Sequence, residues 1–299
     1  MRAGLAVLVL AATLGACGDG GPAGEVGAGG IRETTTAPGE TTTAPAAPDT
    51  TAPPAPATTP PPTAAPPPTG SCSLGAQSPP SGTIPANNAT ALAFAPDGRL
   101  FWAERSGTVR VWQDGAAKEF ARVSVSTSGE RGLLGLAYRD RFVYAFYSDA
   151  NGSAQHVVRW TDCAGTGQNE EIIIDLPAGS SCCHKGGRIA FGPEGALYVT
   201  LGDLFTGAPA QDTSDVRGKV LRYNAGGSVP ADNPFGSGNP VWAYGFRNPF
   251  GIAFGPGGQL SVTNNGPTGD AGSPSTGYDT AVVAVRKGGN YQWPNCYGY

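Results

Sequence analysis

The sequence predicts an all-β fold, a β-propeller, for residues 72–299, and three observations support it. A strand–turn–strand pattern recurs along this part of the chain, and its copies are anchored by four aromatic residues, Phe94, Tyr138, Phe191 and Phe254. The anchors lie roughly 40 to 60 residues apart, the length of one propeller blade with loop insertions. The same part of the sequence contains no convincing amphipathic helix and no glycine-rich phosphate loop after a strand, which argues against a nucleotide-binding α/β fold.

Each copy of the pattern predicts one hairpin. A short apolar strand leads into a turn in which Pro and Gly suit the backbone, and a second strand with alternating apolar residues follows. In chain order the copies span residues 92–102, 136–144, 189–199 and 252–262. The second copy is the loosest, and the last is expected to end shortly after it begins. The pattern therefore predicts about four blades.

The first 71 residues have a composition that cannot form a core. All aromatic residues lie at or after Phe94, and the stretch from Pro22 to Gly70 consists largely of Thr, Pro, Ala and Gly. Such a segment has too little apolar surface to offset the entropy of ordering, so we predict a disordered linker over residues 18–71. The folded domain is then residues 72–299, which is long enough for a sizeable core.

Residues 1–17 have the layout of an export signal. The apolar run from Leu5 to Leu14 is about half the roughly 20 residues that a membrane-spanning helix needs. It ends in Leu14-Gly-Ala-Cys17, which resembles the lipobox of bacterial lipoproteins, where the cysteine is lipidated and becomes the mature N-terminus. We therefore expect Cys17 to be lipidated and the folded domain to be extracytoplasmic, held at the cell membrane by the lipid anchor. An ordinary signal peptide with a chance cysteine is the alternative.

The charge balance excludes one class of partner. The net charge is -4, and only 14% of the residues are charged. No basic surface is available to neutralise a nucleic-acid backbone, so we expect no nucleic acid among the partners.

The cysteines of the folded part leave two interpretations open. Cys182 and Cys183 are adjacent and directly precede His184, which could suggest a metal site. Structural zinc, however, normally takes four ligands from two spaced pairs. An exported chain can form disulfides, so a disulfide from Cys163 to one of the adjacent pair is the preferred interpretation.

The chain has two histidines, and only one of them is a candidate for chemistry. His156 alternates with apolar residues along a predicted strand, which indicates a structural role. His184 lies in a loop that leads directly into a core strand, and functional residues are often found on loops. Asp203 ends the second strand of the same hairpin, so the hairpin can bring it close to His184, as a base oriented by a carboxylate requires. The alternative is a turn aspartate that caps its own backbone.

Six segments, taken in order, carry a family resemblance. They are Gly129–Gly135, His184–Pro193 with Leu197–Asp203, Arg217–Arg222, Ala243–Phe254, Asn265–Pro267 and Gly288–Pro294. Together they resemble the glucose/sorbosone dehydrogenase family, soluble quinoproteins that oxidise aldose sugars, over roughly residues 86–299. The resemblance implies a six-bladed propeller, an aldose substrate and two cofactors, pyrroloquinoline quinone (PQQ) and calcium.

The resemblance also implies roles for particular residues. His184 matches the general base that takes the proton from the anomeric hydroxyl, and Asp203 matches the carboxylate that orients it. Arg247 and Asn248 match residues that contact the quinone, where a guanidinium would stabilise developing negative charge. Glu130 stands where the family commonly has a polar side chain against the cofactor.

The calcium site is implied less completely than the base. Gly266 and Pro267 match positions whose backbone carbonyls ligate calcium, a hard cation that prefers oxygen ligands. The acidic pair that usually follows is not obvious, although Asp270 and Asp279 are present. Cys183 stands where family members often have a polar residue beside the base.

Three hypotheses for function follow. The leading one is a membrane-tethered sugar dehydrogenase that converts aldoses to lactones with PQQ and calcium and passes electrons to an unidentified extracytoplasmic acceptor. The alternative is a non-catalytic extracellular propeller that binds a carbohydrate or a protein, because fold does not fix function. A calcium-dependent lactonase is a third hypothesis, but it needs acidic metal ligands at the central channel.

Family members continue well past the position of Trp293, so we expect this chain to be incomplete, with about four of six blades.

Overall fold

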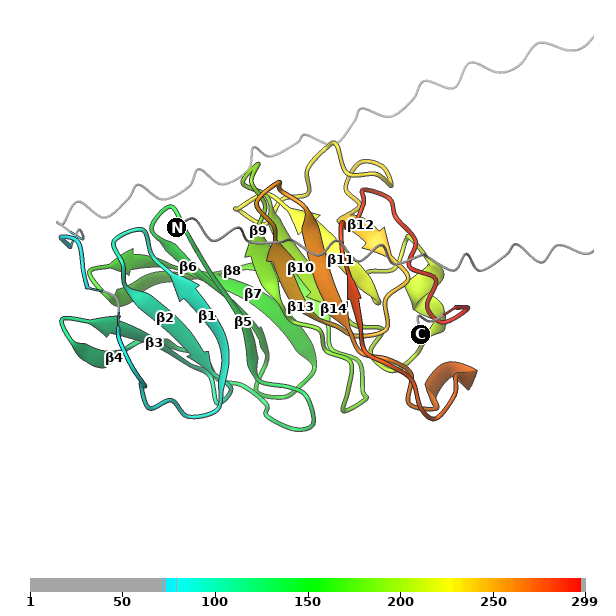
Figure 1. The fold of residues 1–299 in the computed structure, drawn as a ribbon, viewed down its shortest axis with the longest axis horizontal. Coiled ribbons are helices and arrows are strands. Elements are labelled where there is room, and N and C mark those ends of the chain that lie inside the picture. Colours follow the sequence, from blue (N-terminus) through cyan, green and yellow to red (C-terminus); the bar gives the residue numbers. More distant parts are fainter. Residues whose placement is uncertain (1–71, 73, 79, 297–299) are drawn as a thin grey trace, which may run out of the picture. The chain divides into compact units, whose positions relative to one another are not determined.

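The computed structural model describes residues 72, 74–78 and 80–296, which belong to one compact unit, Gly70–Tyr299. The elements in this unit are almost entirely strands (Figure 1), which confirms the predicted all-β fold. No helix in the described residues is long and apolar enough to cross a membrane. The predicted signal and linker, and with them the predicted lipidation site Cys17, lie outside the described residues.

The described strands form four antiparallel sheets, each a meander in chain order. The first sheet contains β1 (Ala89–Phe94), β2 (Leu100–Glu104), β3 (Thr108–Gln113) and β4 (Ala116–Arg122). The second contains β5 (Leu133–Arg139), β6 (Phe142–Ser148), β7 (Ala154–Cys163) and β8 (Thr166–Pro177). The third contains β9 (Ile189–Phe191), β10 (Leu197–Leu201), β11 (Lys219–Tyr223) and β12 (Val241–Tyr244). The fourth contains β13 (Pro249–Phe254), β14 (Leu260–Asn264) and β15 (Thr280–Val282), so the last unit is larger than the sequence pattern predicts. Two short 3-10 helices, η1 (Ala208–Gln211) and η2 (Asp270–Gly272), follow β10 and β14.

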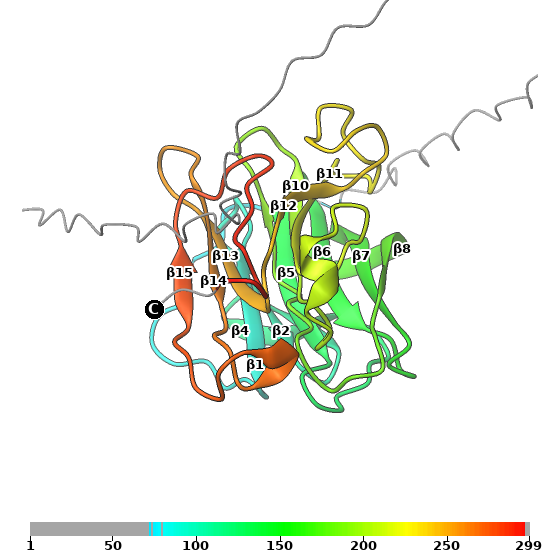
Figure 2. The same ribbon diagram turned by 90° about the vertical axis from the view of Figure 1, so that its right-hand side faces the viewer.

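The sheets are arranged as the blades of a propeller. The first strands of neighbouring sheets lie against one another: β1 contacts β5, β5 contacts β9, and β9 contacts β13. Figure 2 shows β1, β5 and β13 toward the middle of the unit, with β8 and β15 at its outer sides. The loops that connect to the first strands are therefore close to one another, and this arrangement brings distant segments into one site.

Each sequence repeat is the first hairpin of a sheet, as predicted. In three copies the amide of the turn glycine, Gly98, Gly195 or Gly258, donates to the carbonyl three residues earlier at 2.9 to 3.0 Å. These glycines have positive φ angles of 94°, 89° and 75°, which a residue with a side chain rarely adopts. The looser second copy turns instead through Asp140 and Arg141, which both have positive φ. A two-residue turn of this kind needs no Pro–Gly signal, which explains the weaker pattern.

Three apolar clusters hold consecutive sheets together. Phe101 and Trp160 belong to the cluster between the first and second sheets. Phe146 and Leu197 belong to the cluster between the second and third, and Tyr198 to the cluster between the third and fourth. Because each cluster takes side chains from two sheets, a blade buries its faces only against its neighbours.

The disulfides differ from the predicted pairing. Cys163 is bonded to Cys72, and Cys182 is bonded to Cys183, so the predicted bond from Cys163 to one of the adjacent pair is wrong. The reason is the length of β8. This strand of 12 residues starts next to Cys163 and carries the chain roughly 35 Å away before the loop with Cys182 begins. A disulfide needs Cα atoms within about 7 Å, so the two sites cannot be bridged.

Candidate active site

His184 and Asp203 flank the open end of the β9–β10 hairpin, and their side chains meet there. His184 Nδ1 lies 2.6 Å from Asp203 Oδ1, and the two side chains are only 4% and 0% exposed. The predicted proximity of the two residues is therefore present. A carboxylate at Nδ1 favours the tautomer that carries its proton on Nδ1. The other ring nitrogen, Nε2, has no hydrogen-bond partner among the described residues and is left as a proton acceptor.

The Asp203 carboxylate is fixed by more than the histidine. Trp293 Nε1 donates to Oδ2 at 2.8 Å. The backbone amides of Phe205 and Gly207 donate to Oδ1 and Oδ2 at 2.8 and 3.1 Å. Asp203 therefore caps its own turn, as the alternative interpretation expected, and also orients His184. The Phe205 ring packs against the imidazole with the ring centroids 4.9 Å apart.

Glu130 and Asn248 reach the same segment from two other blades. The backbone amide of His184 donates to Glu130 Oε2 at 2.7 Å. Asn248 Oδ1 accepts from the amide of Gly186 at 2.9 Å, and its Nδ2 donates to Asn265 at 2.9 Å and lies 3.4 Å from Glu130. The segment from His184 to Gly186 is thus held by a carboxylate and an amide that also contact each other.

Arg247 is held by a carboxylate that sequence reasoning did not assign to it. Its Nε and Nη2 donate to both oxygens of Asp270 at 2.7 to 3.1 Å, and Nη2 also donates to Thr268 at 2.6 Å. Burial raises the pKa of Asp270, but the hydrogen bonds from Arg247 and Thr268 outweigh this and lower that pKa to about 2. The guanidinium also lies over the Trp293 ring, 5.6 Å from its centroid. Asp270, Thr268 and Trp293 therefore fix the position of the Arg247 guanidinium.

A cavity of about 360 Å³ opens beside this segment. Its lining includes Glu130 and Asn248 from the predicted set, and Lys185 and Gly186, which follow the predicted base. It does not include the other predicted residues, which are His184, Asp203, Arg247, Gly266 and Pro267. Three cationic side chains, Arg105, Lys185 and Arg188, also line it. Within the described residues none of the three forms an ion pair with a carboxylate. Their hydrogen bonds go to backbone carbonyls instead. Glu130 is the one carboxylate among the lining residues, so three cationic side chains face one anionic side chain and the cavity carries an excess of positive charge.

Sequence reasoning missed these three cations. Lys185 follows the predicted base directly, and Arg188 lies in the same segment, so proximity along the chain was an available signal for both. Arg105 follows β2 and carries no such signal, because only the stacking of the blades brings it to the cavity. Burial lowers the pKa of Lys185 to about 8 and also lowers the pKa of Arg188.

Gly266 and Pro267, the predicted calcium ligands, lie in the loop after β14. Within the described residues neither backbone carbonyl oxygen accepts a hydrogen bond. The carboxylate of Asp279 accepts from the Gly266 amide at 2.8 Å and lies 3.3 Å from the side-chain nitrogen of Asn265. Two free carbonyls beside a carboxylate are oxygen donors of the type that calcium prefers. The residues present therefore fit part of a calcium shell.

The metal interpretation of the adjacent cysteines is wrong, because a disulfide leaves no thiolate to ligate a metal. Another trio, His184, Asp203 and Asp270, offers atoms within 4.8 Å of one another. Each carboxylate of this trio already accepts hydrogen bonds, from Trp293 and from Arg247. We therefore regard the trio as two neighbouring hydrogen-bonded pairs, in which Asp203 orients His184 and Asp270 holds Arg247.

The chain matches known proteins over most of its described length. The family model described as Glucose / Sorbosone dehydrogenase matches residues 86–298. Quinoprotein glucose dehydrogenase B of Acinetobacter calcoaceticus is 32% identical over 254 residues, which cover 71% of this chain and 51% of that protein. Aldose sugar dehydrogenase YliI of Escherichia coli K12 is 30% identical over 224 residues, which cover 68% of this chain and 58% of that protein. The chain thus spans a little over half the length of these relatives.

A solved structure shares the fold. The PQQ-bound form of an aldose sugar dehydrogenase from Streptomyces coelicolor superposes with a TM-score of 0.63 at 31% identity. The match covers 72% of this chain and 64% of that one. It confirms the propeller architecture of the blades described above.

Proposed function

Because the chain belongs to the glucose/sorbosone dehydrogenase family, we propose that it is a quinoprotein that oxidises aldose sugars to lactones. One observation carries the proposal: a buried histidine is oriented by a buried carboxylate, and the residue after it, Lys185, lines a cavity with an excess of positive charge. A base beside an anion-binding cavity suits a reaction that removes a proton and a hydride from one substrate. The proposed substrate is an aldose with a free anomeric hydroxyl.

In this proposal His184 is the base. Asp203 holds the proton on Nδ1, so Nε2 can accept the proton of the anomeric hydroxyl. As Nε2 becomes protonated, the imidazole gains a positive charge next to the Asp203 carboxylate, which stabilises it. Trp293 and the turn amides keep that carboxylate from rotating away. The ring would then not need to reorganise during proton transfer.

The cavity suits PQQ, which carries several carboxylates. Arg105, Lys185 and Arg188 would face those carboxylates, and Glu130 and Asn248 would contact the same molecule from the other blades. When bound, PQQ supplies the electron-poor carbonyl that accepts the hydride from the anomeric carbon. Asp270 holds the Arg247 guanidinium in place near His184 and Asp203, where it would stabilise negative charge that develops in the reaction.

Calcium would be held in part by the backbone carbonyls of Gly266 and Pro267, with Asp279 as the nearby carboxylate. A calcium ion there would add positive charge to the site and would therefore strengthen the binding of an anionic quinone.

We also propose that the protein is exported and lipid-anchored through Cys17. The Cys72–Cys163 disulfide supports this, since such bonds persist in oxidising compartments. Membrane fractionation tests it: the full chain should be recovered with the membrane, and Cys17→Ala should release it. Recovery of Cys17→Ala with the membrane would argue against the anchor.

The activity is tested by reconstitution. The purified full chain is loaded with PQQ and calcium, and reduction of a redox dye is followed with a panel of aldoses. We expect sugar-dependent dye reduction that needs both PQQ and calcium and that yields a lactone. Protein that binds PQQ but reduces no dye with any aldose would contradict the proposed activity and favour a binding module.

A further inference from the structure

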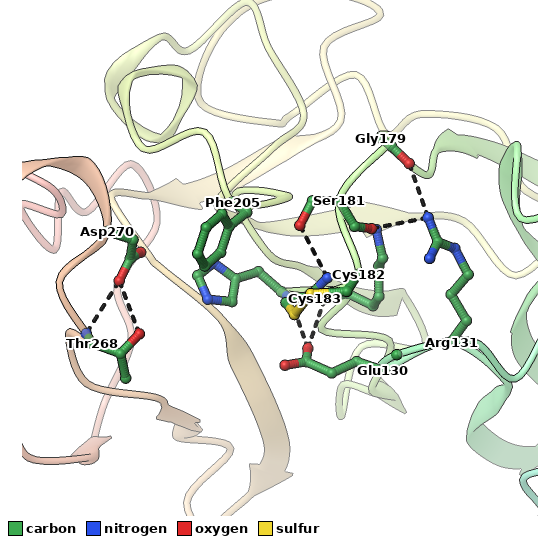
Figure 3. Close-up of a disulfide and its surroundings, with 12 residues drawn as sticks. Glu130, Arg131, Gly179, Ser181, Cys182, Cys183, Phe205, Thr268 and Asp270 are labelled. Carbon is green, nitrogen blue, oxygen red and sulfur yellow. Dashed lines mark hydrogen bonds between the residues drawn. A yellow bond between two sulfur atoms is a disulfide. The ribbon is translucent and has the colours of Figure 1, made fainter.

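A disulfide between two neighbouring residues lies directly before the proposed base. Cys182 and Cys183 are bonded to each other, and His184 follows. Cys182 is exposed and Cys183 is half-buried, whereas His184 is buried. Figure 3 shows the disulfide above Glu130, between Arg131 on one side and Phe205 on the other. The bond is therefore open to solvent while the residue that it precedes is not.

Glu130 makes two hydrogen bonds to the segment that contains the disulfide. The amide of Glu130 donates to the carbonyl of Cys182 at 2.9 Å. In return, the Glu130 carboxylate accepts from the amide of His184 at 2.7 Å. The approach is close: a Cβ atom at Gly129 would lie 2.4 Å from the Cys182 carbonyl oxygen, which only glycine avoids. The residues on both sides of Cys183 are thus fixed to one carboxylate-bearing loop.

The rest of the loop is held in the same way. Arg131 donates to the carbonyls of Ser181 and Gly179 at 2.9 and 3.2 Å, and the amide of Cys183 donates to Ser181 Oγ at 3.1 Å. His184 itself has a φ of 60°, a left-handed conformation that a non-glycine residue adopts only when its surroundings impose it. The segment before His184 therefore has to be constrained for the imidazole to reach Asp203.

We propose that the Cys182–Cys183 disulfide is a positioning device for His184. By linking two neighbouring side chains it restricts the backbone that carries the Cys182 carbonyl and the His184 amide, the two groups that Glu130 holds. Without the bond this segment gains conformational freedom, and the imidazole loses its alignment with Asp203. The catalytic consequence rests on the proposed function, but the structural consequence does not.

Histidine-selective NMR tests the structural part, since His184 and His156 are the only histidines in the chain. His156, in β7, bonds Asp175 at 2.6 Å, and it serves as an internal reference for folding. In Cys182→Ser/Cys183→Ser we expect the His184 ring signals to shift and broaden while those of His156 stay unchanged. In the control Cys72→Ser/Cys163→Ser, which removes the other described disulfide, we expect the His184 signals to stay as in the wild type. An unchanged His184 signal in the first variant would overturn the proposal.

Wild-type protein in dithiothreitol gives a second route that needs no substitution. The dithiol donates two electrons and two protons, becomes a cyclic disulfide and leaves two cysteine thiols. We expect this treatment to move the His184 signals of the wild type and of Cys72→Ser/Cys163→Ser, but not to move those of Cys182→Ser/Cys183→Ser any further. A response to dithiothreitol that persists in Cys182→Ser/Cys183→Ser would assign the effect to another bond and contradict the proposal.

Kinetics test the catalytic part with the PQQ-loaded full chain. A base displaced by about 1 Å costs roughly 10- to 100-fold in rate. We expect Cys182→Ser/Cys183→Ser to lose kcat by that factor with little change in KM, and Cys72→Ser/Cys163→Ser to keep its kcat. An unchanged kcat in the first variant would overturn the positioning role. If the wild type itself shows no sugar oxidation, the proposed function fails, while the NMR result still decides whether the disulfide positions His184.

Discussion

At the scale of single residues, two histidines make the same hydrogen bond in different surroundings. His156 Nδ1 lies 2.6 Å from Asp175, as His184 Nδ1 does from Asp203. The carboxylate of Asp175 is 77% exposed, whereas that of Asp203 is fully buried. Water screens the first pair, and the second is surrounded by protein donors. Burial and second-layer hydrogen bonds, rather than the pair itself, make His184 the candidate base.

The two histidines provide a matched pair of substitutions. We expect His184→Ala to lower kcat for sugar oxidation by a factor of roughly 100 or more, because it removes the general base. His156→Ala should change kcat by less than a factor of about two, since His156 lies in β7 and its partner Asp175 is exposed and has no part in the proposed site. Steady-state dye reduction with PQQ-loaded protein measures both. Equal losses in the two variants would rule out a specific role for His184.

Lys185 predicts a pH dependence of quinone binding. Burial lowers its pKa to about 8, so it is charged below this pH and neutral above it. We expect the affinity for PQQ to fall as the pH rises through about 8, by roughly fivefold, the equivalent of about 1 kcal/mol for one lost charge at the cavity. Titrations of apo-protein with PQQ at several pH values measure this.

Two buried lysines supply the variant and its control for that titration. Lys185→Met should bind PQQ more weakly and lose the change near pH 8. Lys219 has a pKa lowered by burial to about 8 as well, but its ammonium bonds carbonyls outside the cavity. Lys219→Met should therefore keep the pH dependence. Loss of the dependence in Lys219→Met alone would refute the assignment to Lys185.

Asp270 predicts a dependence of stability on pH. Its pKa lies at about 2 in the folded chain, below the ordinary value of 3.8. The lowered value means that the carboxylate stabilises the fold above pH 4 or so, and that this contribution is lost as the pH falls through about 2. Asp270→Asn should lower the free energy of unfolding at pH 7 by about 2 kcal/mol. Urea unfolding should show the difference from the wild type shrinking below pH 4, and a difference independent of pH would contradict the prediction.

At the scale of elements, local patterns predicted the hairpins but not their contacts. The repeats at 92–102 and 189–199 can be recognised because the Pro and Gly of the turn and the alternating apolar residues of the strands lie close together in the sequence. The same hairpin geometry predicted that His184 and Asp203 meet. In contrast, the Trp293 bond to Asp203 joins residues 90 positions apart, and no local signal reports it. Such contacts depend on how the blades stack.

Gly202 lies where two elements pass very close. A Cβ atom there would lie 2.1 Å from the carbonyl oxygen of His184 and 3.0 Å from Asn248 Oδ1. Gly202→Ala should therefore push the His184 segment away from β10 and lower kcat by at least tenfold, with a loss of stability of roughly 1–3 kcal/mol. Gly226→Ala is the control, because its nearest neighbour is the end of an arginine side chain at 4.0 Å. Wild-type kcat in Gly202→Ala would show that the site tolerates the shift.

At the scale of the whole molecule, the described blades form a chain of neighbours. Each apolar cluster joins two consecutive sheets, and the site takes residues from loops of all four. The all-β propeller could be predicted because one repeat per blade is enough to reveal it. The place of Arg105 at the cavity could not, because it depends on which loops the stacking brings together. The Cys72–Cys163 bond joins residues with a sequence separation of 91, and no local signal reports it. The chain also spans little more than half the length of its curated relatives.

The Cys72–Cys163 disulfide acts at this scale too. It closes a loop with a sequence separation of 91 residues and ties the segment before β1 to the end of β7. Cys72→Ser/Cys163→Ser should lower the free energy of unfolding by about 2–4 kcal/mol, because the unfolded chain gains freedom. Urea unfolding of the two proteins measures the change. An unchanged midpoint would mean that the bond does not restrict the unfolded chain.

The central claim, that His184 takes the proton while the sugar loses a hydride, is tested most directly by a single turnover. PQQ-loaded protein is mixed rapidly with glucose or with glucose deuterated at the anomeric carbon, and reduction of the bound quinone is followed by absorbance. We predict that deuterium slows this step in the wild type and that His184→Ala slows it by a factor of roughly 100 or more while binding PQQ normally. Quinone reduction at the wild-type rate in His184→Ala would contradict the account.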